Sequence, residues 1–259
     1  MIFVAAGTRD GRELAGYILG HGYEVTASVV SQYGQELLRA YKGIKVNDQP
    51  LDEAGMVEYF QANGVKCFVD ASHPYAANIS TNAMKACAQV GVPYIRFERD
   101  TCRLEYHKAY YVNNYEEAAQ KAGELGKNVF LTTGSRSLPI FAHSDALADK
   151  RIVCRILPEP EVIQEARGLG FTPDNIIAMQ GPFSKELNKE LFIKYEADVV
   201  VTKNSGKLGG ADTKFAAVKE LNLPLVVIDR PKVDYTNVTD SFEGVLEFIW
   251  KKEKEFQRE

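Results

Sequence analysis

The first residues that could bind a ligand lie in a glycine-containing turn near the start of the sequence. Residues 6–11 read AGTRDG, after the apolar run Ile2–Ala6 and before an amphipathic stretch. A turn of this kind at a helix start can present backbone N–H groups to a phosphate. Only Gly7 and Gly11 are glycines, so the segment is not the GxGxxG motif. A tight turn without a ligand explains it equally well.

A denser polar group stands at residues 69–76, VDASHPYA, again directly after an apolar run. Asp70, Ser72 and His73 fall together there, and Pro74 suits the first turn of a following helix. His73 could donate a proton, or it could face a carboxylate as a cation. The competing interpretation is a helix cap or a solvated histidine.

Basic residues follow other apolar runs, although the net charge of the chain is −4. They are Arg96 and Arg99 in PYIRFER, Arg136 in LTTGSR, and Lys203 and Lys214 around the loop KNSGKLGG. Arginine binds carboxylate and phosphate through paired N–H donors, but Arg96 and Arg99 could instead pair with Glu98 on the surface. This placement favours a polyanionic ligand, which could be a nucleotide, a sugar phosphate or a polycarboxylate.

The end of the second apolar run bears on the type of coenzyme. Residues 28–33 read SVVSQY. They lack both the acidic residue that binds the ribose of NAD and the arginine that binds the 2′-phosphate of NADP. The hydroxyls of Ser28 and Ser31 could bond a ribose, or they could be ordinary polar residues at a strand end.

Short apolar runs alternate with amphipathic stretches, and this pattern predicts parallel sheets flanked by helices. The predicted strands are Ile2–Ala6, Glu24–Val30, Ile44–Val46, Lys66–Asp70, Tyr94–Phe97, Tyr110–Val112, Asn128–Leu131, Arg151–Ile156, Ile176–Met179, Asp198–Thr202 and Leu225–Ile228. The predicted helices are Arg12–Leu19, Gln35–Ala40, Asp52–Ala62, Ala76–Gln89, Tyr115–Leu125, Glu161–Arg167, Lys185–Tyr195, Thr213–Leu221 and Phe242–Lys251. The rhythm breaks at Thr101–Lys108, which predicts a linker between two lobes, 1–105 and 106–259. Ligands of such folds bind beyond the carboxyl ends of the strands, where the candidate residues fall.

Composition excludes several classes of protein. The 259 residues have a pI near 5.7, so no global basic field for nucleic acid is expected. No apolar run approaches the roughly 20 residues of a membrane span, and the N-terminus lacks the basic start of a signal peptide. The four cysteines form no CxxC pair, which favours ordinary thiols in the cytoplasm and no protein-bound metal.

Taken in order, four segments resemble the precorrin-6A reductase family of vitamin B12 biosynthesis. They are GTRDGRELA at 7–15, DASHPYAANIS at 70–80, LTTGSRSL at 131–138, and VTKNSGK at 201–207 with Lys214 beyond it. PYIRFER supports the match, which spans residues 4 to about 215. DASHPYA and VTKNSG are much more specific than the glycine turn.

The resemblance implies an NADH- or NADPH-dependent reduction of one C=C bond in a tetrapyrrole that carries many carboxylates. A hydride goes to ring carbon C19 and a proton to C18, and the product could be handed directly to the next enzyme of the pathway. The implied fold has two Rossmann-like lobes that can exchange their terminal strands. The first, 1–105, mainly serves the coenzyme, and the second, 106–259, serves the substrate.

The resemblance also suggests residue roles, each assigned by position. The coenzyme phosphates are assigned to Gly7, Thr8 and Arg9. Ser28 and Asp70 are further coenzyme candidates because of their places at strand ends, independently of the resemblance. Ser72 and His73 are the catalytic candidates beside the reacting atoms. Substrate carboxylates are assigned to Arg96, Arg136, Lys203 and Lys214, and a closing loop to Asn204, Ser205 and Gly206.

Two departures from the family pattern leave the coenzyme open between NADH and NADPH. Ala6 precedes Gly7 where many relatives have two glycines, and the second strand lacks an NADP arginine. Whether the ring carries cobalt is equally open. The alternatives are another NAD(P)-dependent oxidoreductase with a small acidic substrate, and a non-catalytic two-lobe protein that binds a polyanion.

Overall fold

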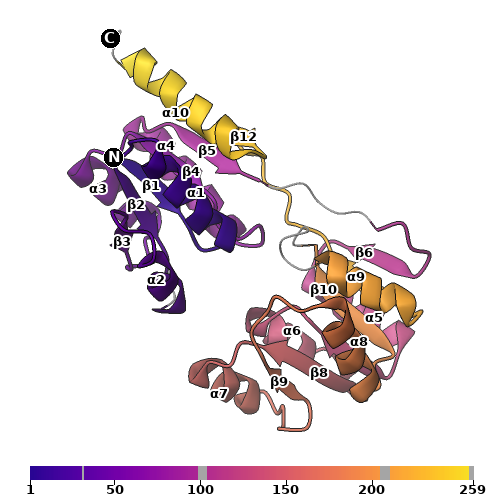
Figure 1. Ribbon diagram of the computed structural model, residues 1–259. Helices are drawn as coiled ribbons and strands as arrows, with labels where there is room; N and C mark the ends of the chain where they lie inside the picture. The colour runs from indigo at the N-terminus through magenta and orange to yellow at the C-terminus, as the bar shows by residue number, and fades with distance from the viewer. Residues whose placement is uncertain (31, 99–103, 205–210, 257–259) are drawn as a thin grey trace. The chain divides into compact units, whose positions relative to one another are not determined.

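The chain folds into two compact units, each built on its own parallel sheet (Figure 1). The computed structural model describes residues 1–30, 32–98, 104–204 and 211–256. The first unit comprises Met1–Asp100 together with Lys232–Glu259, and the second comprises Thr101–Pro231. No helix within the described ranges is long and apolar enough to cross a membrane.

The sheet of the first unit has the strand order β12-β5-β4-β1-β2-β3. Its strands are β1 (Ile2–Ala5), β2 (Val25–Ser28), β3 (Lys45–Asn47), β4 (Cys67–Asp70), β5 (Tyr94–Phe97) and β12 (Val238–Thr239). The helices are α1 (Arg9–Gly20), α2 (Gln32–Leu38), α3 (Glu53–Asn63), α4 (Ala77–Val90) and α10 (Phe242–Phe256). Every paired strand in this sheet is parallel to its neighbour.

Both faces of this sheet are covered, which explains why β1 is a continuous apolar run. Side chains alternate between faces along a strand. Ile2 and Val4 pack in one core with residues of α1 and α10, whereas Phe3 packs in the other core with residues of α3 and α4.

The sheet of the second unit has the order β6-β11-β10-β7-β8-β9. Its strands are β6 (Ala109–Val112), β7 (Asn128–Leu131), β8 (Arg151–Ile156), β9 (Ile176–Ala178), β10 (Val199–Lys203) and β11 (Leu225–Ile228). The helices are α5 (Tyr115–Leu125), α6 (Leu138–Ala142), α7 (Pro160–Gly168), α8 (Lys185–Lys194) and α9 (Ala211–Glu220), with 3-10 turns η1 (Ser135–Ser137) and η2 (Asp145–Leu147). Phe130, Val153 and Val200 pack in one core with residues of α8 and α9.

The two units exchange their sixth strands, as the family resemblance implied. β6 follows β5 in sequence but pairs with β11, and β12 follows β11 but pairs with β5. The predicted second lobe, 106–259, is therefore wrong at its C-terminal end. The apolar face of α10, with Val245 and Ile249 fully buried, packs in the core of the first unit. Helical periodicity predicts such a face but not which core receives it.

Each sheet has one point at which the strand order reverses. In the first unit the chain runs from β1 out to β3 and then returns to β4 on the other side of β1. In the second unit it runs from β7 to β9 and returns to β10 beside β7. The carboxyl ends of strands at such switch points are where open α/β sheets bind ligands. The structure therefore predicts one ligand-binding edge in each unit.

Candidate functional site

The switch point of the first unit joins the turn after β1 to the segment after β4. Thr8 caps α1, because its Oγ1 accepts from the Gly11 N–H at 2.9 Å. The same hydroxyl donates to the Ala71 carbonyl at 3.1 Å. A Cβ on Gly11 would lie 2.9 Å from both Ala6 Cα and the Ala71 oxygen. Glycine at position 11 thus allows the two turns to approach closely.

The start of α1 fits the phosphates of a dinucleotide. Gly7 is exposed, and a Cβ there would meet no atom within 4 Å, so a ligand can approach the backbone. The helix N-terminus adds a positive partial charge. Arg9 is exposed and pairs with Glu13 at 2.7 Å. Ser28 is half-buried at the end of β2, and its Oγ accepts from Asn47 Nδ2 at 3.3 Å.

Asp70 lies fully buried at the end of β4, where four donors surround its carboxylate. Oδ1 accepts from the Ser72 N–H at 3.0 Å and from Arg96 Nη1 at 2.8 Å. Oδ2 accepts from Ser80 Oγ at 2.6 Å and from Tyr94 OH at 2.7 Å. Burial alone would raise the pKa of Asp70, but Arg96 and the hydrogen bonds outweigh burial and hold it below its ordinary value.

Arg96 is 1% exposed and is paired inside the first unit through Nη1 and Nε. Besides its bond to Asp70, Nη1 donates to Ser72 Oγ at 3.0 Å, and Nε donates to Glu98 Oε2 at 2.6 Å. Tyr235 packs on the guanidinium, with 5.4 Å between Cζ and the ring centroid. The structure therefore does not present Arg96 to a substrate carboxylate. The predicted contact is corrected to an internal one, because two carboxylates of this unit already neutralise the charge.

Ser72 belongs to this network, whereas His73 lies outside it. Ser72 is 5% exposed and is held by Asp70 and Arg96, whereas His73 is exposed. The Tyr75 N–H donates to His73 Nδ1 at 3.3 Å. This bond requires an unprotonated Nδ1, so the proton of a neutral ring lies on Nε2. His73 is thus held in the tautomer that can donate from Nε2.

The switch point of the second unit joins the turn after β7 to the end of β10. Thr132 Oγ1 donates to the Val201 carbonyl at 3.0 Å, and Ser137 Oγ donates to Thr133 Oγ1 at 2.8 Å. Gly134 has a φ of 81°, a backbone conformation that favours glycine. These contacts fix the turn that carries the exposed Arg136.

Lys203 ends β10 and interacts with Arg136 through their like charges. Burial lowers the pKa of Lys203 to about 8, and the positive charge of Arg136 contributes to that shift. Burial raises the pKa of Tyr115, at the start of α5, and Arg136 opposes that rise. Arg136 therefore lies within electrostatic range of both groups. A bound anion would relieve the repulsion between the two cations.

The remaining predicted substrate residues divide between buried and undescribed positions. Asn204 is 1% exposed; its N–H donates to the Ile228 carbonyl at 3.0 Å, and its own carbonyl accepts from Arg230 Nε at 3.1 Å. Lys214 on α9 is 7% exposed. Ser205 and Gly206 lie outside the described residues.

Sequence reasoning missed three buried polar residues near these edges. Ser80 and Tyr94 complete the shell of Asp70, and Arg155 lies near the end of β8 with 7% exposure. A signal was present for Arg155, because a cation within the apolar run RIVCRI needs a reason to be buried. Neither Ser80 nor Tyr94 had a comparable signal.

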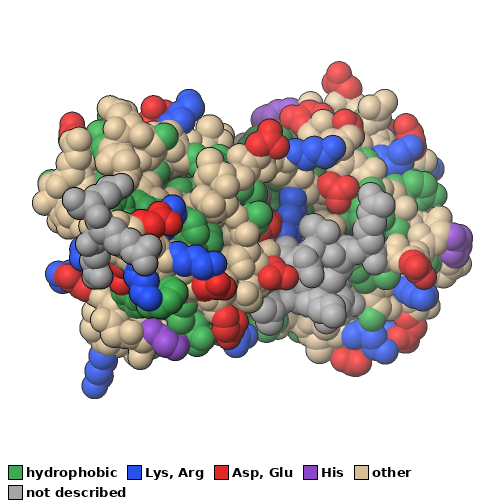
Figure 2. All heavy atoms as spheres, turned by 90° about the horizontal axis from the view of Figure 1, so that it is seen from above, with side chains coloured by type: hydrophobic (Ala, Val, Ile, Leu, Met, Phe, Trp, Pro, Cys, Tyr) green, Lys and Arg blue, Asp and Glu red, His purple; other side chains and the backbone are tan. Residues whose placement is uncertain are grey.

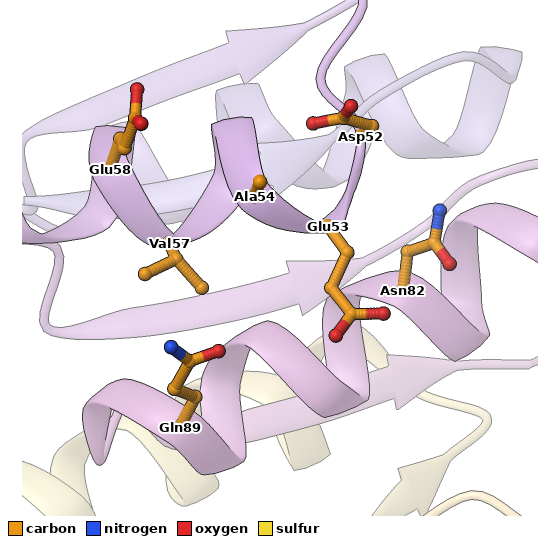
Figure 3. Close-up of a pocket in the computed structure, with 7 residues that line it drawn as sticks. All are labelled: Asp52, Glu53, Ala54, Val57, Glu58, Asn82 and Gln89. Carbon is orange, nitrogen blue, oxygen red and sulfur yellow. The ribbon is translucent and has the colours of Figure 1, made fainter.

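A surface pocket of about 510 Å³ lies between α3 and α4 (Figure 3). Its lining is Asp52, Glu53, Ala54, Val57, Glu58, Asn82 and Gln89. Three carboxylates and no basic side chain would repel a polyanion, so this pocket does not suit such a ligand. On the face seen in Figure 2, acidic and basic side chains are interspersed, without a broad basic surface.

Known proteins resemble this chain over nearly its whole length. The family model described as Precorrin-6x reductase CbiJ/CobK matches residues 1–250. Cobalt-precorrin-6A reductase from Priestia megaterium is 42% identical over 248 residues, which cover 95% of this chain and 96% of that protein. Precorrin-6A reductase from Rhodobacter capsulatus is 30% identical and covers 96% of this chain and 95% of its own length.

A solved structure shares the fold as well. The structure described as CobK precorrin-6A reductase aligns with a TM-score of 0.79 at 28% identity, and the alignment covers 97% of this chain and 96% of that one. This match confirms the predicted α/β fold with two parallel sheets. The chain therefore belongs to the precorrin-6A and cobalt-precorrin-6A reductase family, and it is an oxidoreductase of cobalamin biosynthesis.

Proposed function

We propose that this protein reduces the C18–C19 bond of precorrin-6A or of its cobalt form, with NADH or NADPH as the reductant. The observation that carries the proposal is the pair Lys203 and Arg136 at the switch point of the second unit. Their mutual repulsion and the lowered pKa of Lys203 favour a ligand with carboxylates. Family membership identifies the class of ring that carries these carboxylates.

We assign the coenzyme to the switch point of the first unit. Gly7 leaves the backbone open to a phosphate, Thr8 fixes the start of α1, and Arg9 adds positive charge. Ser28 is the candidate contact for a ribose. The coenzyme, when bound, supplies the hydride. The acidic or basic residue that would select between NADH and NADPH is missing from the end of β2, so the proposal covers both.

Asp70 and Arg96 act in this proposal as positioning residues. Asp70 binds the Ser72 N–H, and Arg96 binds the Ser72 hydroxyl, so the ion pair fixes the start of the segment that carries His73. This replaces direct contacts of Asp70 with the coenzyme and of Arg96 with the substrate. An Arg96→Lys variant keeps the positive charge but loses the planar set of N–H donors that binds Asp70, Ser72 and Glu98 together. It is expected to lower kcat more than it raises the coenzyme KM.

We assign donation of the proton at C18 to His73, and binding of the ring carboxylates to residues of the second unit. Proton donation to C18 requires the imidazolium form of His73: the ring takes up a proton at Nδ1, which ends the bond from the Tyr75 N–H, and Nε2 then gives its proton to C18 as hydride reaches C19, leaving a neutral ring. Arg136 and Lys203 bind carboxylates, with Lys214 as a further candidate. Asn204, Ser205 and Gly206 remain the proposed closing segment over the ring.

The proposal is tested by oxidation of NADH and NADPH under anaerobic conditions, with precorrin-6A and cobalt-precorrin-6A as alternative substrates. Turnover with one pair supports the reductase assignment and identifies both the coenzyme and the ring. A folded protein that binds coenzyme but turns over neither ring would refute it. Arg136→Ala and Lys203→Ala are expected to weaken ring binding more than coenzyme binding, which fluorescence titration of NADH and NADPH measures separately.

The proposed setting is the cytoplasm, where the reduced ring is transferred directly to the next enzyme of the pathway. Cys67, Cys87 and Cys154 are free and buried, as expected in a reducing compartment. Transfer is tested by adding an excess of inactive reductase to a coupled assay. Slower coupled flux supports direct hand-off, and unchanged flux supports free diffusion.

A further inference from the structure

Arg155 is a buried cation whose charge no carboxylate of the described chain neutralises. It is 7% exposed, close to the carboxyl end of β8. Its Nη1 donates to Asn188 Oδ1 at 2.8 Å, and its Cζ lies 3.9 Å from the ring centroid of Phe183. Neither partner carries a negative charge. Burial lowers the pKa of Arg155 to about 10, and no neighbouring charge contributes to that shift.

The surroundings hold the guanidinium in place instead of neutralising it. Asn188 is fully buried, and its Nδ2 donates to the Ser184 carbonyl at 2.8 Å. That bond turns Oδ1 toward Arg155. Phe183 covers one face of the guanidinium. Nε and Nη2 of Arg155 have no acceptor within the described residues. Neither nitrogen is completely buried, so both remain accessible to solvent.

Arg155 lies close to the switch point of the second unit. Leu131 on β7 pairs with Cys154 on β8, so Arg155 lies one residue beyond that pair, beside the turn that follows β7. β8 also contacts η1, the turn that carries Arg136. A ligand at this edge of the sheet would therefore lie near the end of β8.

Arg155 is nevertheless separate from the pair formed by Arg136 and Lys203. Side chains alternate along a strand, so Arg155 shares the face of Val153, which packs in the core with α8 and α9. Lys203 is three residues after Val200, a member of that same core, and so points to the opposite face of β10. Neither Lys203 nor Arg136 contributes to the pKa shift of Arg155.

We propose that Arg155 is a second carboxylate-binding position of this edge, which takes an acetate or propionate group of the tetrapyrrole. The inference rests on the proposed function, because that function supplies a ligand with carboxylates at several points of its rim. The free Nε and Nη2 donors suit a carboxylate bound in bidentate fashion. Phe183 and Asn188 keep the guanidinium oriented for it.

Arg155→Met should weaken substrate binding with little change in stability. Methionine keeps the packing against Phe183 and removes an uncompensated buried charge, which offsets the loss of the donor to Asn188 Oδ1. We expect the melting temperature to change little. We also expect the substrate KM to rise by about tenfold or more, since a charge-assisted contact is lost, with the coenzyme KM unchanged. Arg155→Lys, which keeps the charge, is expected to restore part of the affinity.

Arg151→Met is the matched control. Arg151 begins the same strand at the opposite edge of the sheet, where its Nη1 donates to the Tyr195 carbonyl at 3.2 Å. This variant should leave the substrate KM unchanged. An unchanged KM in Arg155→Met, or an equal rise in both variants, would overturn the inference. So would a loss of stability in Arg155→Met with normal binding.

Equilibrium binding separates this inference from the proposed reaction. The probe is uroporphyrin, a tetrapyrrole with acetate and propionate side chains, whose fluorescence reports binding without coenzyme. Weaker binding to Arg155→Met than to the wild-type protein supports the carboxylate contact even if no ring is reduced. Equal binding, or none to the wild-type protein, overturns it. Absence of turnover in the wild-type protein would refute only the proposed reduction.

Discussion

Replacement of Arg96 by methionine is expected to destabilise the first unit strongly. The change leaves the fully buried Asp70 carboxylate without its cation and also removes the donors to Ser72 and Glu98. Loss of one partner from a buried ion pair costs about 3–5 kcal/mol. With an m-value of about 2 kcal/mol/M, the urea midpoint should fall by about 1.5–2.5 M.

The destabilisation should depend on pH, with a sign that follows from Asp70. In the wild-type protein the pKa of Asp70 is lowered, so its stabilisation is present above the unfolded pKa and is lost only as pH falls through the folded value. Without Arg96, only the hydrogen bonds from Ser72, Ser80 and Tyr94 oppose burial, which is the largest single influence, so we expect the pKa of Asp70 to rise above its ordinary value. Asp70 of the variant should then take up a proton on folding. The loss in free energy of unfolding, relative to the wild-type protein, should therefore become smaller as the pH falls from about 7 to about 5.

The single tryptophan makes the measurement specific to the first unit. Trp250 is half-exposed on α10, which packs on that unit, so its fluorescence during urea unfolding follows this unit. Lys251→Met is the control, because Lys251 forms an exposed pair with Glu247 on the same helix. Its midpoint should hardly move. The reasoning would be refuted if the urea midpoint of Arg96→Met lay close to that of the wild-type protein, or if the difference between the two midpoints stayed constant across the pH range.

Three further predictions concern the two switch points. The substrate KM should rise as pH increases through about 8, because Lys203 loses its charge there. Lys203→Arg should make the substrate KM less dependent on pH in this range. The same pH dependence in the variant as in the wild-type protein would contradict the assignment. His73→Ala should lower kcat by about 10²-fold or more with little change in KM, and a wild-type kcat would show that His73 has no role as an acid. Gly11→Ala should cost about 1–3 kcal/mol in urea unfolding, because its Cβ would strike the backbone of Ala6 and Ala71. Gly20→Ala in the same helix meets no atom within 4 Å and is the control; equal midpoints for the two variants would disprove the close approach.

The sequence by itself determined the repeating order of strands and helices and the positions of the strand ends. Continuous apolar runs such as Ile2–Ala5 report burial on both faces of a parallel sheet, which is a local property. The polar residues after β4 and β7 could therefore be placed at carboxyl ends from the order of residues alone. The motifs DASHPYA and VTKNSG identified the family that the comparisons confirm.

Only the tertiary structure decided which strands meet and which charges remain for a ligand. The sixth strand of the first sheet, β12, comes from the other side of the linker, and this two-residue strand carries no periodicity that could have predicted it. Arg96 and Arg155 are both arginines in apolar strands, yet one meets two carboxylates and the other meets none within the described residues. Glu98 is a close neighbour of Arg96 in sequence, but the difference depends mainly on Asp70 and Asn188, which lie 26 and 33 residues from the arginines that they contact. A charge pattern along the chain cannot reveal it, because burial and pairing are set by contacts across the fold.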